Sequence, residues 1–549
     1  MERHGNTIAT AVALALSLPL LTAAAPPAQI SAERIKAHVR TLSSDAFAGR
    51  GPTQIGDAKT IEYLAAQFAA AGLEPGGENG SWYQDVPLVR YERVGPATVS
   101  VRVAGATVPL AIGGQVTAAS SAPGRTVLTD VPMVFLGYGM VAPELSWNSF
   151  EGADLKGKVA VFLAGDPDFE APAAGAFGGR SLVYGGRFGA KAAAAAKAGA
   201  AAVLVVHETA PASYPWSQVA GNEGAPTYGL RPAAGAAPSP ISGWLHRDAA
   251  VDLFRRAGLD FDALKSRARD KNFRAVALGD AALSAALEVR ATPVVSRNVV
   301  ARLPGTRFPQ ETVIFGAHWD ANGIGAADAA GDTIRNGAVD NATGTATLLE
   351  IARAFGRGAR PQRSILFIGY TAEEKGLLGA EYYAANPLAP LETTAAVFNL
   401  DPHVVIGRAR SLDLIGGGRT DLEQDLVRVA SRHGLRVEEE RSPEAGWYFR
   451  SDHFAFAKRG VPALAFRAGR DLVGGGKPAG DAAIEAYNAT RYHQTTDEFD
   501  PAWDMAGAAQ EGQVAYELGR DLANSRRWPS WNEGVEYKPI REASAALRR

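Results

Sequence analysis

Hydrophobic residues recur at helical spacing close to the N-terminus. In the stretches 31–42 (SAERIKAHVRTL) and 57–73 (DAKTIEYLAAQFAAAGL), apolar residues lie three or four positions apart, and Gly72 stands where a helix would end. This pattern predicts two amphipathic helices, followed by a loop that enters a strand.

The pattern changes to short β-branched runs in the segment 91–292. Runs such as ATVSVRV, VPMVFLGYG and GKVAVFLAG are separated by Gly and Pro, and an alanine-rich helix at 189–200 leads into a strand at 201–208. We expect this segment to form a separate β-rich domain with one or two helices.

From about residue 295 onward, continuous apolar strands alternate with helices. The expected strands are 297–303, 312–318, 364–370 and 394–400, and the expected helices are 343–355, 375–385, 422–433 and 504–523. Strands without polar alternation are typical of a sheet that is covered on both faces. The pattern therefore predicts an α/β fold with a mostly parallel central sheet flanked by helices.

The first 25 residues have the pattern of a signal peptide. A short polar head precedes an apolar run at 8–21, and Ala23, Ala24 and Ala25 form a cleavage-like site. The run is too short to span a bilayer comfortably. We expect export to the periplasm or beyond, with no stable membrane span after signal removal.

The predicted organisation is a signal peptide at 1–25, a first part of the α/β domain at 26–90, an inserted segment at 91–292 and the main α/β part at 293–549.

Composition narrows the possible chemistry. The 549 residues carry a net charge of −2 and no long basic run, so nothing points to a nucleic-acid partner. The chain contains no cysteine, which excludes disulfides, thiolate metal sites and a cysteine nucleophile. Any bound metal must therefore use histidine and carboxylate ligands.

Histidines and carboxylates stand at the ends of successive α/β elements. In open α/β sheets, sites form at the carboxyl ends of the strands. Two imidazoles and three carboxylates can hold two zinc-like ions if one carboxylate bridges them, and a neighbouring carboxylate can then act as a general base. The residues at these positions are His318, Asp320, Asp340, Glu373, Glu374, Asp401, Tyr492 and His493.

Several motifs resemble those of the M28 family of zinc peptidases, the group of bacterial aminopeptidases and glutamate carboxypeptidase II. FGAHWD, VDNATG, YTAEEKGLLGA, FNLD and YHQTTDEFD match in order and spacing, and LSSDAFAGRG at 42–51 resembles the N-terminal stretch of that group. VFLGYG and DLKGKVAVFL resemble the protease-associated (PA) domain. The resemblance covers nearly the whole chain and implies a phosphorylase/hydrolase-like zinc exopeptidase fold with an inserted PA domain.

The resemblance also implies a set of metal ligands. His318 and Asp401 would bind one Zn²⁺, Glu374 and His493 would bind a second, and Asp340 would bridge the two. Two Zn²⁺ per chain are therefore expected, although cobalt or manganese would also suit these ligands.

Further roles follow from the same resemblance. Glu373 would be the general base, Asp320 would orient the imidazole of His318, and Tyr492 would donate a hydrogen bond to the oxyanion. The peptide bond between Asp340 and Asn341 is expected to be cis.

The substrate pocket is less well defined by the sequence. Tyr448, Phe449, Arg450 and His453 are candidates for substrate contacts. Pro402 departs from the family pattern, in which methionine commonly follows the late aspartate.

We interpret the chain as an aminopeptidase that removes N-terminal residues from peptides with a free N-terminus. One alternative is a carboxypeptidase or other amide hydrolase on the same fold, which would need a cationic pocket, and Arg450 and Arg467 are the nearby candidates for it. Another alternative is a glutaminyl cyclase-like transferase, which would bind only one metal and would leave His318 and Asp401 without a metal to bind. A catalytically inactive binding protein is the alternative from another class, and the presence of every expected ligand argues against it.

Overall fold

The structure is a computed structural model that describes residue 1 and residues 29–548, apart from residues 173, 174, 176, 178, 180, 234–240, 402 and 403. The apolar run and cleavage-like site of the expected signal peptide, and Pro402, lie outside the described residues. Among the helices described, none combines the length and the apolar character that a membrane crossing requires.

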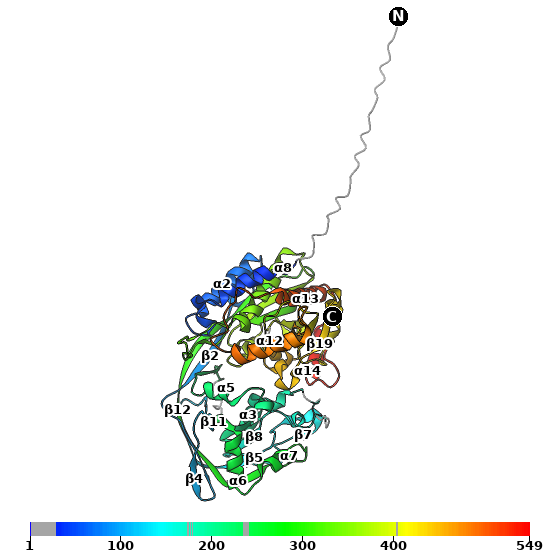
Figure 1. The fold of residues 1–549 in the computed structure, drawn as a ribbon. Coiled ribbons are helices and arrows are strands. Elements are labelled where there is room, and N and C mark those ends of the chain that lie inside the picture. The colour runs from blue at the N-terminus through cyan, green and yellow to red at the C-terminus, as the bar shows by residue number, and fades with distance from the viewer. Residues whose placement is uncertain are drawn as a thin grey trace.

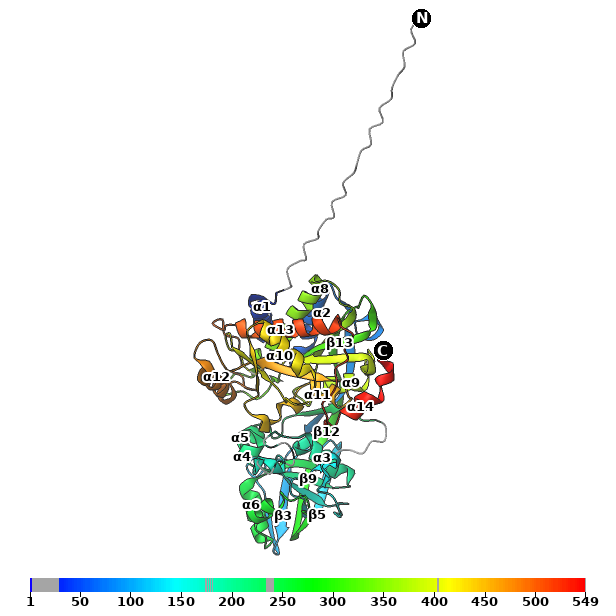
Figure 2. The same cartoon turned by 90° about the vertical axis from the view of Figure 1, so that its right-hand side faces the viewer.

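One long strand joins two lobes of the molecule (Figures 1 and 2). Strand β12 (Val276–Leu303) pairs antiparallel with β5 (Gly124–Phe135) in one lobe and with β16 (Arg363–Tyr370) in the other. It crosses position 292, where the sequence suggests a change of domain. Strand β2 (Tyr83–Arg93) pairs with residues 289–299, and this pairing keeps the junction extended.

The α/β lobe, which contains residues 29–93 and 294–548, is built on a mostly parallel sheet, as the sequence predicts. The strand order is β12-β16-β13-β17-β20-β18-β19, and the pairs from β16 to β20 are all parallel. The strands not yet bounded are β13 (Phe308–His318), β17 (Thr394–Asn399), β20 (Ala463–Ala468), β18 (Ser411–Leu414) and β19 (Arg436–Glu439). The last two were too short to be recognised from hydrophobic periodicity.

Helices cover both faces of this sheet, which confirms the predicted α/β class. Two separate hydrophobic clusters join the helices to the strands. One face carries α1 (Ala32–Leu42), α2 (Asp57–Ala70), α8 (Gly344–Arg357), α10 (Leu422–Arg432) and α13 (Ala506–Ala523). The other carries α9 (Leu378–Ala385) and α11 (His453–Ala457).

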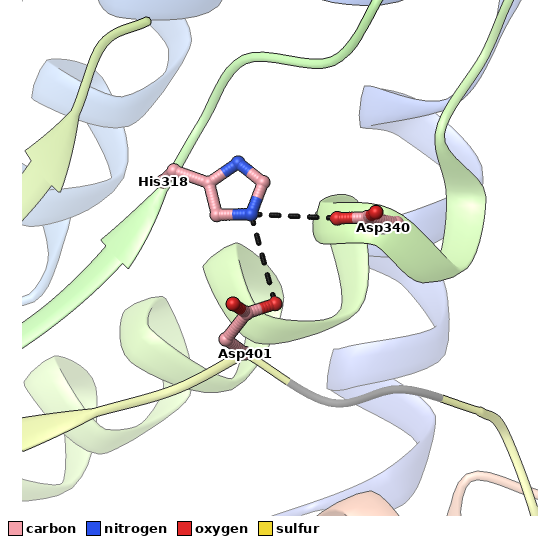
Figure 3. Close-up of side chains that lie close together, drawn as sticks. All are labelled: His318, Asp340 and Asp401. Atoms are coloured by element: carbon pink, nitrogen blue, oxygen red, sulfur yellow. Dashed lines mark ion pairs between the residues drawn. The ribbon is translucent and has the colours of Figure 1, made fainter. Parts of the chain in front are cut away.

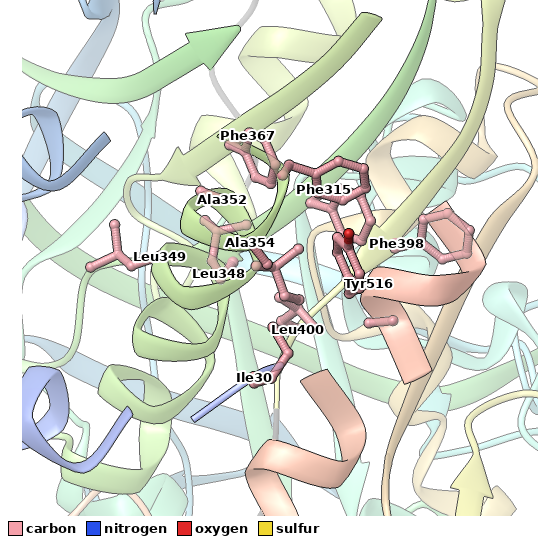
Figure 4. Packing of buried hydrophobic residues seen from close by; sticks show 14 of the residues in the cluster. Ile30, Phe315, Leu348, Leu349, Ala352, Ala354, Phe367, Phe398, Leu400 and Tyr516 are labelled. Atoms are coloured by element: carbon pink, nitrogen blue, oxygen red, sulfur yellow. The ribbon is translucent and has the colours of Figure 1, made fainter. Parts of the chain in front are cut away.

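The alternation of side chains along β13 explains how one strand serves both faces. Phe315 points into the first cluster and Ile314 into the second, and both are fully buried. The ring of Phe315 stacks on Phe367 at 5.6 Å and lies 5.3 Å from the ring of Phe398 (Figure 4). The strand that ends in His318 is therefore fixed from both sides.

The inserted lobe, which contains residues 94–293, has its own core and its own parallel strands. Strands β5, β8 (Val159–Leu163), β9 (Ala202–His207) and β11 (Ile241–His246) pair in parallel. The alanine-rich helix α3 (Phe188–Lys197) precedes β9, as predicted, and α6 (Arg247–Arg256) and α7 (Phe261–Arg267) pack on the hydrophobic core.

Shorter elements complete the described chain. The strands are β1 (Glu74–Pro75), β3 (Thr98–Val103), β4 (Ala106–Pro109), β6 (Val141–Ala142), β7 (Trp147–Asn148), β10 (Thr227–Leu230), β14 (Gly323–Ile324) and β15 (Ile334–Arg335). The helices are α4 (Thr209–Ala212), α5 (Trp216–Gly221), α12 (Gly476–Thr490) and α14 (Lys538–Ala543).

Replacing Phe315 with alanine is expected to lower the free energy of unfolding by about 3–5 kcal/mol, because removal of a buried ring that packs against two others leaves a cavity. Chemical denaturation measures the change. Val427→Ala, at a side chain that is 54% exposed, is the control and should change stability by less than about 0.5 kcal/mol. Equal effects of the two substitutions would contradict this assignment of the core.

Candidate active site

The five residues expected to bind metal converge at one edge of the sheet. His318 ends β13, Asp401 follows β17, and Glu374 follows β16. Asp340 lies in the turn that precedes α8, and His493 follows α12. The carboxyl ends of neighbouring parallel strands meet at the same edge, so residues far apart in the sequence become neighbours.

Asp340 stands between the two histidines. Its Oδ1 lies 3.4 Å from Nε2 of His318, and its Oδ2 lies 3.2 Å from Nε2 of His493. Asp401 Oδ1 is 3.6 Å from His318 Nε2 (Figure 3), and Glu374 Oε2 is 3.1 Å from His493 Nε2. The donor atoms form two groups of three, each within 4.8 Å, and Asp340 belongs to both.

These donors fit a pair of divalent ions. Imidazole nitrogens and carboxylate oxygens without thiolate are ligands that Zn²⁺ accepts. The buried Oε1 of Glu374 has no hydrogen-bond partner among the described residues, which leaves an oxygen available to a cation. Burial lowers the pKa of His493, but Glu374 and Asp340 outweigh it and raise the pKa to about 10. The cluster thus has the negative field that would attract a positive ion.

Asp320 ties the end of β13 to the loop that carries the glutamates. Its carboxylate accepts hydrogen bonds from the backbone N–H of Glu373 at 3.0 Å and of Glu374 at 3.4 Å. Nδ1 of His318 lies 3.1 Å from the backbone oxygen of Asp320 and 3.7 Å from its Oδ1. The imidazole is therefore oriented mainly by the Asp320 backbone, while the carboxylate holds the neighbouring loop.

Asp340 is held by groups from two other segments. Asp497, four residues after His493, accepts from the backbone N–H of Val339 at 3.2 Å and of Asp340 at 3.1 Å. On the other side, a side chain at Gly344 would meet Leu400 O at 2.3 Å, so α8 can start this close to the end of β17 only with glycine there. The peptide bond after Asp340 is cis, as the resemblance predicts.

Asp401 is positioned by a short chain of hydrogen bonds. Asn399 Nδ2 donates to Ser451 Oγ at 2.7 Å, and Ser451 Oγ donates to Asp401 Oδ2 at 2.5 Å. One carboxylate oxygen of Asp401 is thus engaged, and the other faces His318. No sequence pattern around Ser451 predicts this role.

Two family models match the chain. Residues 298–516 match the model described as Peptidase family M28, and residues 120–238 match that of the PA domain. The M28 match contains all five clustered residues. Residues 298–516 thus form a domain of the peptidase family M28 type.

Relatives of this chain cover it only in part. A "Probable zinc metalloprotease" from Pyrenophora teres f. teres (strain 0-1) is 36% identical over 129 residues, 24% of this chain and 26% of that protein. "Leupeptin-inactivating enzyme 1" from Streptomyces exfoliatus is 28% identical over 226 residues, 40% of this chain and 47% of that protein. The chain therefore matches between a quarter and a half of the length of these relatives. The solved structure "Aminopeptidase from Aneurinibacillus sp. strain AM-1" covers 90% of this chain and 95% of its own, with 20% identity and a TM-score of 0.50, which shows a shared fold.

A cavity of about 370 Å³ opens onto the two donor groups of the M28 domain. Of the residues expected to contact substrate, Phe449, Arg450 and His453 line it, and Tyr448 does not. The Tyr448 ring packs 4.7 Å from that of His453 and is buried in a hydrophobic cluster behind the cavity wall.

Other lining residues are not predicted from the sequence. Tyr184 and Arg187 come from the PA domain, more than a hundred residues before the first metal-binding motif, and Trp447 comes from the M28 domain. Arg467, which the carboxypeptidase alternative names as a pocket residue, also lines the cavity. These residues do not stand at the ends of predicted strands. Whether the residues of the PA domain reach the cavity depends on how the two lobes pack.

Glu373 and Tyr492 both face this cavity. Burial, together with the nearby Asp452 and Asp401, raises the pKa of Glu373 well above its ordinary value, although the charge of His318 opposes the shift. Burial also raises the pKa of Tyr492 well above its ordinary value. Its ring stacks on that of His493 at 3.8 Å. A carboxyl group that binds a proton readily and a phenol that keeps its proton thus stand beside the donor groups.

Arg50, in the motif LSSDAFAGRG, connects the loop that follows His318 to the loop that precedes Asp340. Its fully buried guanidinium donates to four backbone carbonyls: Trp319 O at 2.8 Å, Leu42 O at 2.8 Å, Asn336 O at 2.7 Å and Gly337 O at 2.7 Å. Trp319 follows His318, and Gly337 precedes Asp340 by three residues. This arginine therefore links the loops on which the first donor group depends.

Arg50→Gln is expected to lower both thermal stability and zinc affinity, because it leaves buried carbonyls without donors at about 1–3 kcal/mol each. Differential scanning calorimetry and zinc titration measure the two effects, and Arg50→Lys should retain part of each. Arg40→Gln, at an exposed arginine in the last turn of α1, is the control. Unchanged zinc affinity in a folded Arg50→Gln protein would refute the link to the site.

Proposed function

We propose that this chain is a two-zinc aminopeptidase that hydrolyses the N-terminal peptide bond of peptides. The observation that carries the proposal is the sharing of one carboxylate, Asp340, by two donor groups that each contain a histidine. The match of residues 298–516 to the model of peptidase family M28 supports peptides as substrates. We also propose, from the N-terminal pattern alone, that the protein acts in the periplasm or is secreted.

His318 and Asp401 would hold one ion, Glu374 and His493 the other, and Asp340 both. When bound, the two ions would supply Lewis acidity to the scissile carbonyl and lower the pKa of a water molecule. The remaining chemistry belongs to side chains around the cavity.

Glu373 is the proton carrier in this proposal. Its raised pKa lets the carboxylate take a proton from the attacking water and return it to the leaving nitrogen near neutral pH. It is adjacent to Glu374, so the carrier stands next to the donor group without belonging to it.

Tyr492 is the hydrogen-bond donor to the scissile carbonyl oxygen. Its phenol stays protonated, because burial raises its pKa, and it can stabilise the negative charge that develops as the carbonyl is attacked.

A free N-terminus suits the charge at this end of the cavity. Glu373 and Asp401 line it together with Glu374 and Asp340. An ammonium group of the substrate would be attracted to these carboxylates, whereas an acetylated N-terminus would lose that interaction.

Metal analysis after dialysis against zinc tests the shared carboxylate. The wild-type chain is expected to retain two equivalents of zinc, and Asp401→Asn and Glu374→Gln one each. Asp340→Asn should retain less than one, because both donor groups lose a ligand. Asp130→Asn, in the inserted lobe, is the control. Equal loss in Asp340→Asn and Asp401→Asn would argue against bridging.

Hydrolysis of aminoacyl-p-nitroanilides, beside N-acetylated copies, tests the activity. Only the free-amine substrates should be cleaved, chelator should abolish the cleavage, and zinc should restore it. Glu373→Gln should lower kcat by at least about 100-fold while leaving zinc content at two equivalents, because the proton carrier is lost. A zinc-loaded protein that cleaves no aminoacyl substrate would refute the proposal.

A further inference from the structure

Three arginines also line the cavity that contains the donor groups. Arg187 comes from the PA domain, just before α3, and Arg450 and Arg467 come from the M28 domain. Among the described residues, neither Arg187 nor Arg450 has a carboxylate within 4.0 Å or a side-chain hydrogen bond to another protein group. Lys458, in the same cavity, differs, because its ammonium is paired with Glu381. In the described part of the chain, Arg187 and Arg450 therefore lack the carboxylate partner that Lys458 has.

The ring of Trp447 lies beside two of these arginines. The guanidinium of Arg450 lies 4.4 Å from the centre of its ring and that of Arg467 lies 5.8 Å away. Stacking on an aromatic ring fixes the plane of a guanidinium and leaves its N–H groups free to bind an anion.

The PA domain delivers Arg187 through a rigid contact between the lobes. Leu182 N donates to Pro443 O at 3.1 Å, and the ring of Tyr184 lies 5.0 Å from that of Phe454. Farther back, Asp166 accepts from Val183 N at 3.1 Å. The loop before Arg187 is therefore attached at both lobes, so the guanidinium is positioned before any substrate enters.

The two unpaired arginines repel each other. Burial, followed by the charge of Arg450, lowers the pKa of Arg187 to about 10. A bound anion would relieve this repulsion, and a carboxylate is the anion that every peptide carries.

We propose that Arg187 and Arg450 bind a carboxylate of the substrate, so that this chain prefers peptides with an acidic group close to the scissile bond. The inference rests on the proposed aminopeptidase function and adds a substrate class to it. The carboxylate has two possible sources: the side chain of an acidic residue, or the C-terminus of a peptide only two or three residues long.

The shape of the site is compatible with both sources. A second cavity of about 360 Å³ shares Arg450, Tyr492 and His493 with the first, and residues such as Tyr214 and Trp244 of the PA domain line it. Arg450 thus stands at the junction, where either a side chain or the end of a short peptide would pass.

Two matched substrate pairs distinguish the sources. Glutamyl- against glutaminyl-p-nitroanilide tests a side-chain carboxylate, and Leu-Gly against Leu-Gly-amide tests a terminal carboxylate. In at least one pair, kcat/KM for the carboxylate member should be higher by roughly 10-fold to 100-fold, as expected for charge-assisted hydrogen bonds. Arg187→Gln and Arg450→Gln should each bring that ratio close to one.

Control variants separate binding from folding. Arg187→Lys and Arg450→Lys keep the charge and should retain part of the preference. Lys458→Gln removes a cation from the same cavity that is already paired, and its ratio should equal that of the wild type. A Lys458→Gln protein that loses the preference as strongly as Arg187→Gln would overturn the assignment to the unpaired arginines.

The outcomes keep the two proposals apart. Cleavage of all four substrates with ratios near one would overturn the carboxylate site and leave the aminopeptidase function standing. If nothing is cleaved, calorimetric binding of Glu-Ala against Gln-Ala, and of Leu-Gly against Leu-Gly-amide, to zinc-loaded protein decides the matter. The proposal is supported if, in at least one pair, the ligand with the additional carboxylate binds more tightly and Arg187→Gln removes this difference. Equal binding within both pairs would overturn it.

Discussion

The carboxylate of Asp340 is the feature around which the candidate active site is arranged. Its two oxygens face two different histidines, at 3.4 Å and 3.2 Å, so a shift of this one side chain would disturb both donor groups. Asp497 and Arg50 hold the loop that carries it, through its amides and through the carbonyl of Gly337. Arg50 belongs to the N-terminal part of the α/β lobe and Asp497 to its C-terminal part. Segments that are distant in sequence thus meet at the Asp340 loop.

Charge is the main difficulty of such a site. Five carboxylates line the same cavity, and buried carboxylates are unfavourable unless a cation or a hydrogen-bond donor compensates them. Ser451 donates to Asp401, Lys458 is paired with Glu381, and two imidazoles face Asp340, Asp401 and Glu374. Arginines from both lobes line the same cavity, so it carries groups of both charges. A peptide likewise carries both charges, with an ammonium group at one end and a carboxylate at the other or along its side.

Much of this arrangement could be predicted from the sequence. The strands β13, β16 and β17 are continuous apolar runs, and His318, Glu374 and Asp401 are recognisable because each lies at the end of one of them or within four residues after it. Arg187 could not be found in this way, since its position depends on how the inserted lobe packs against the α/β lobe. Tyr448 was expected at the substrate pocket because of its neighbours in sequence, but a tight turn directs its ring into the core instead. The same limit applies at residue 292, where a change in composition coincides with an uninterrupted strand.

Anomalous diffraction from zinc-grown crystals, recorded on either side of the zinc absorption edge, tests the shared carboxylate most directly. Two peaks per chain are predicted, one beside His318 and Asp401 and the other beside Glu374 and His493, with Asp340 between them. A single peak, or peaks that leave Asp340 without a metal, would contradict the account.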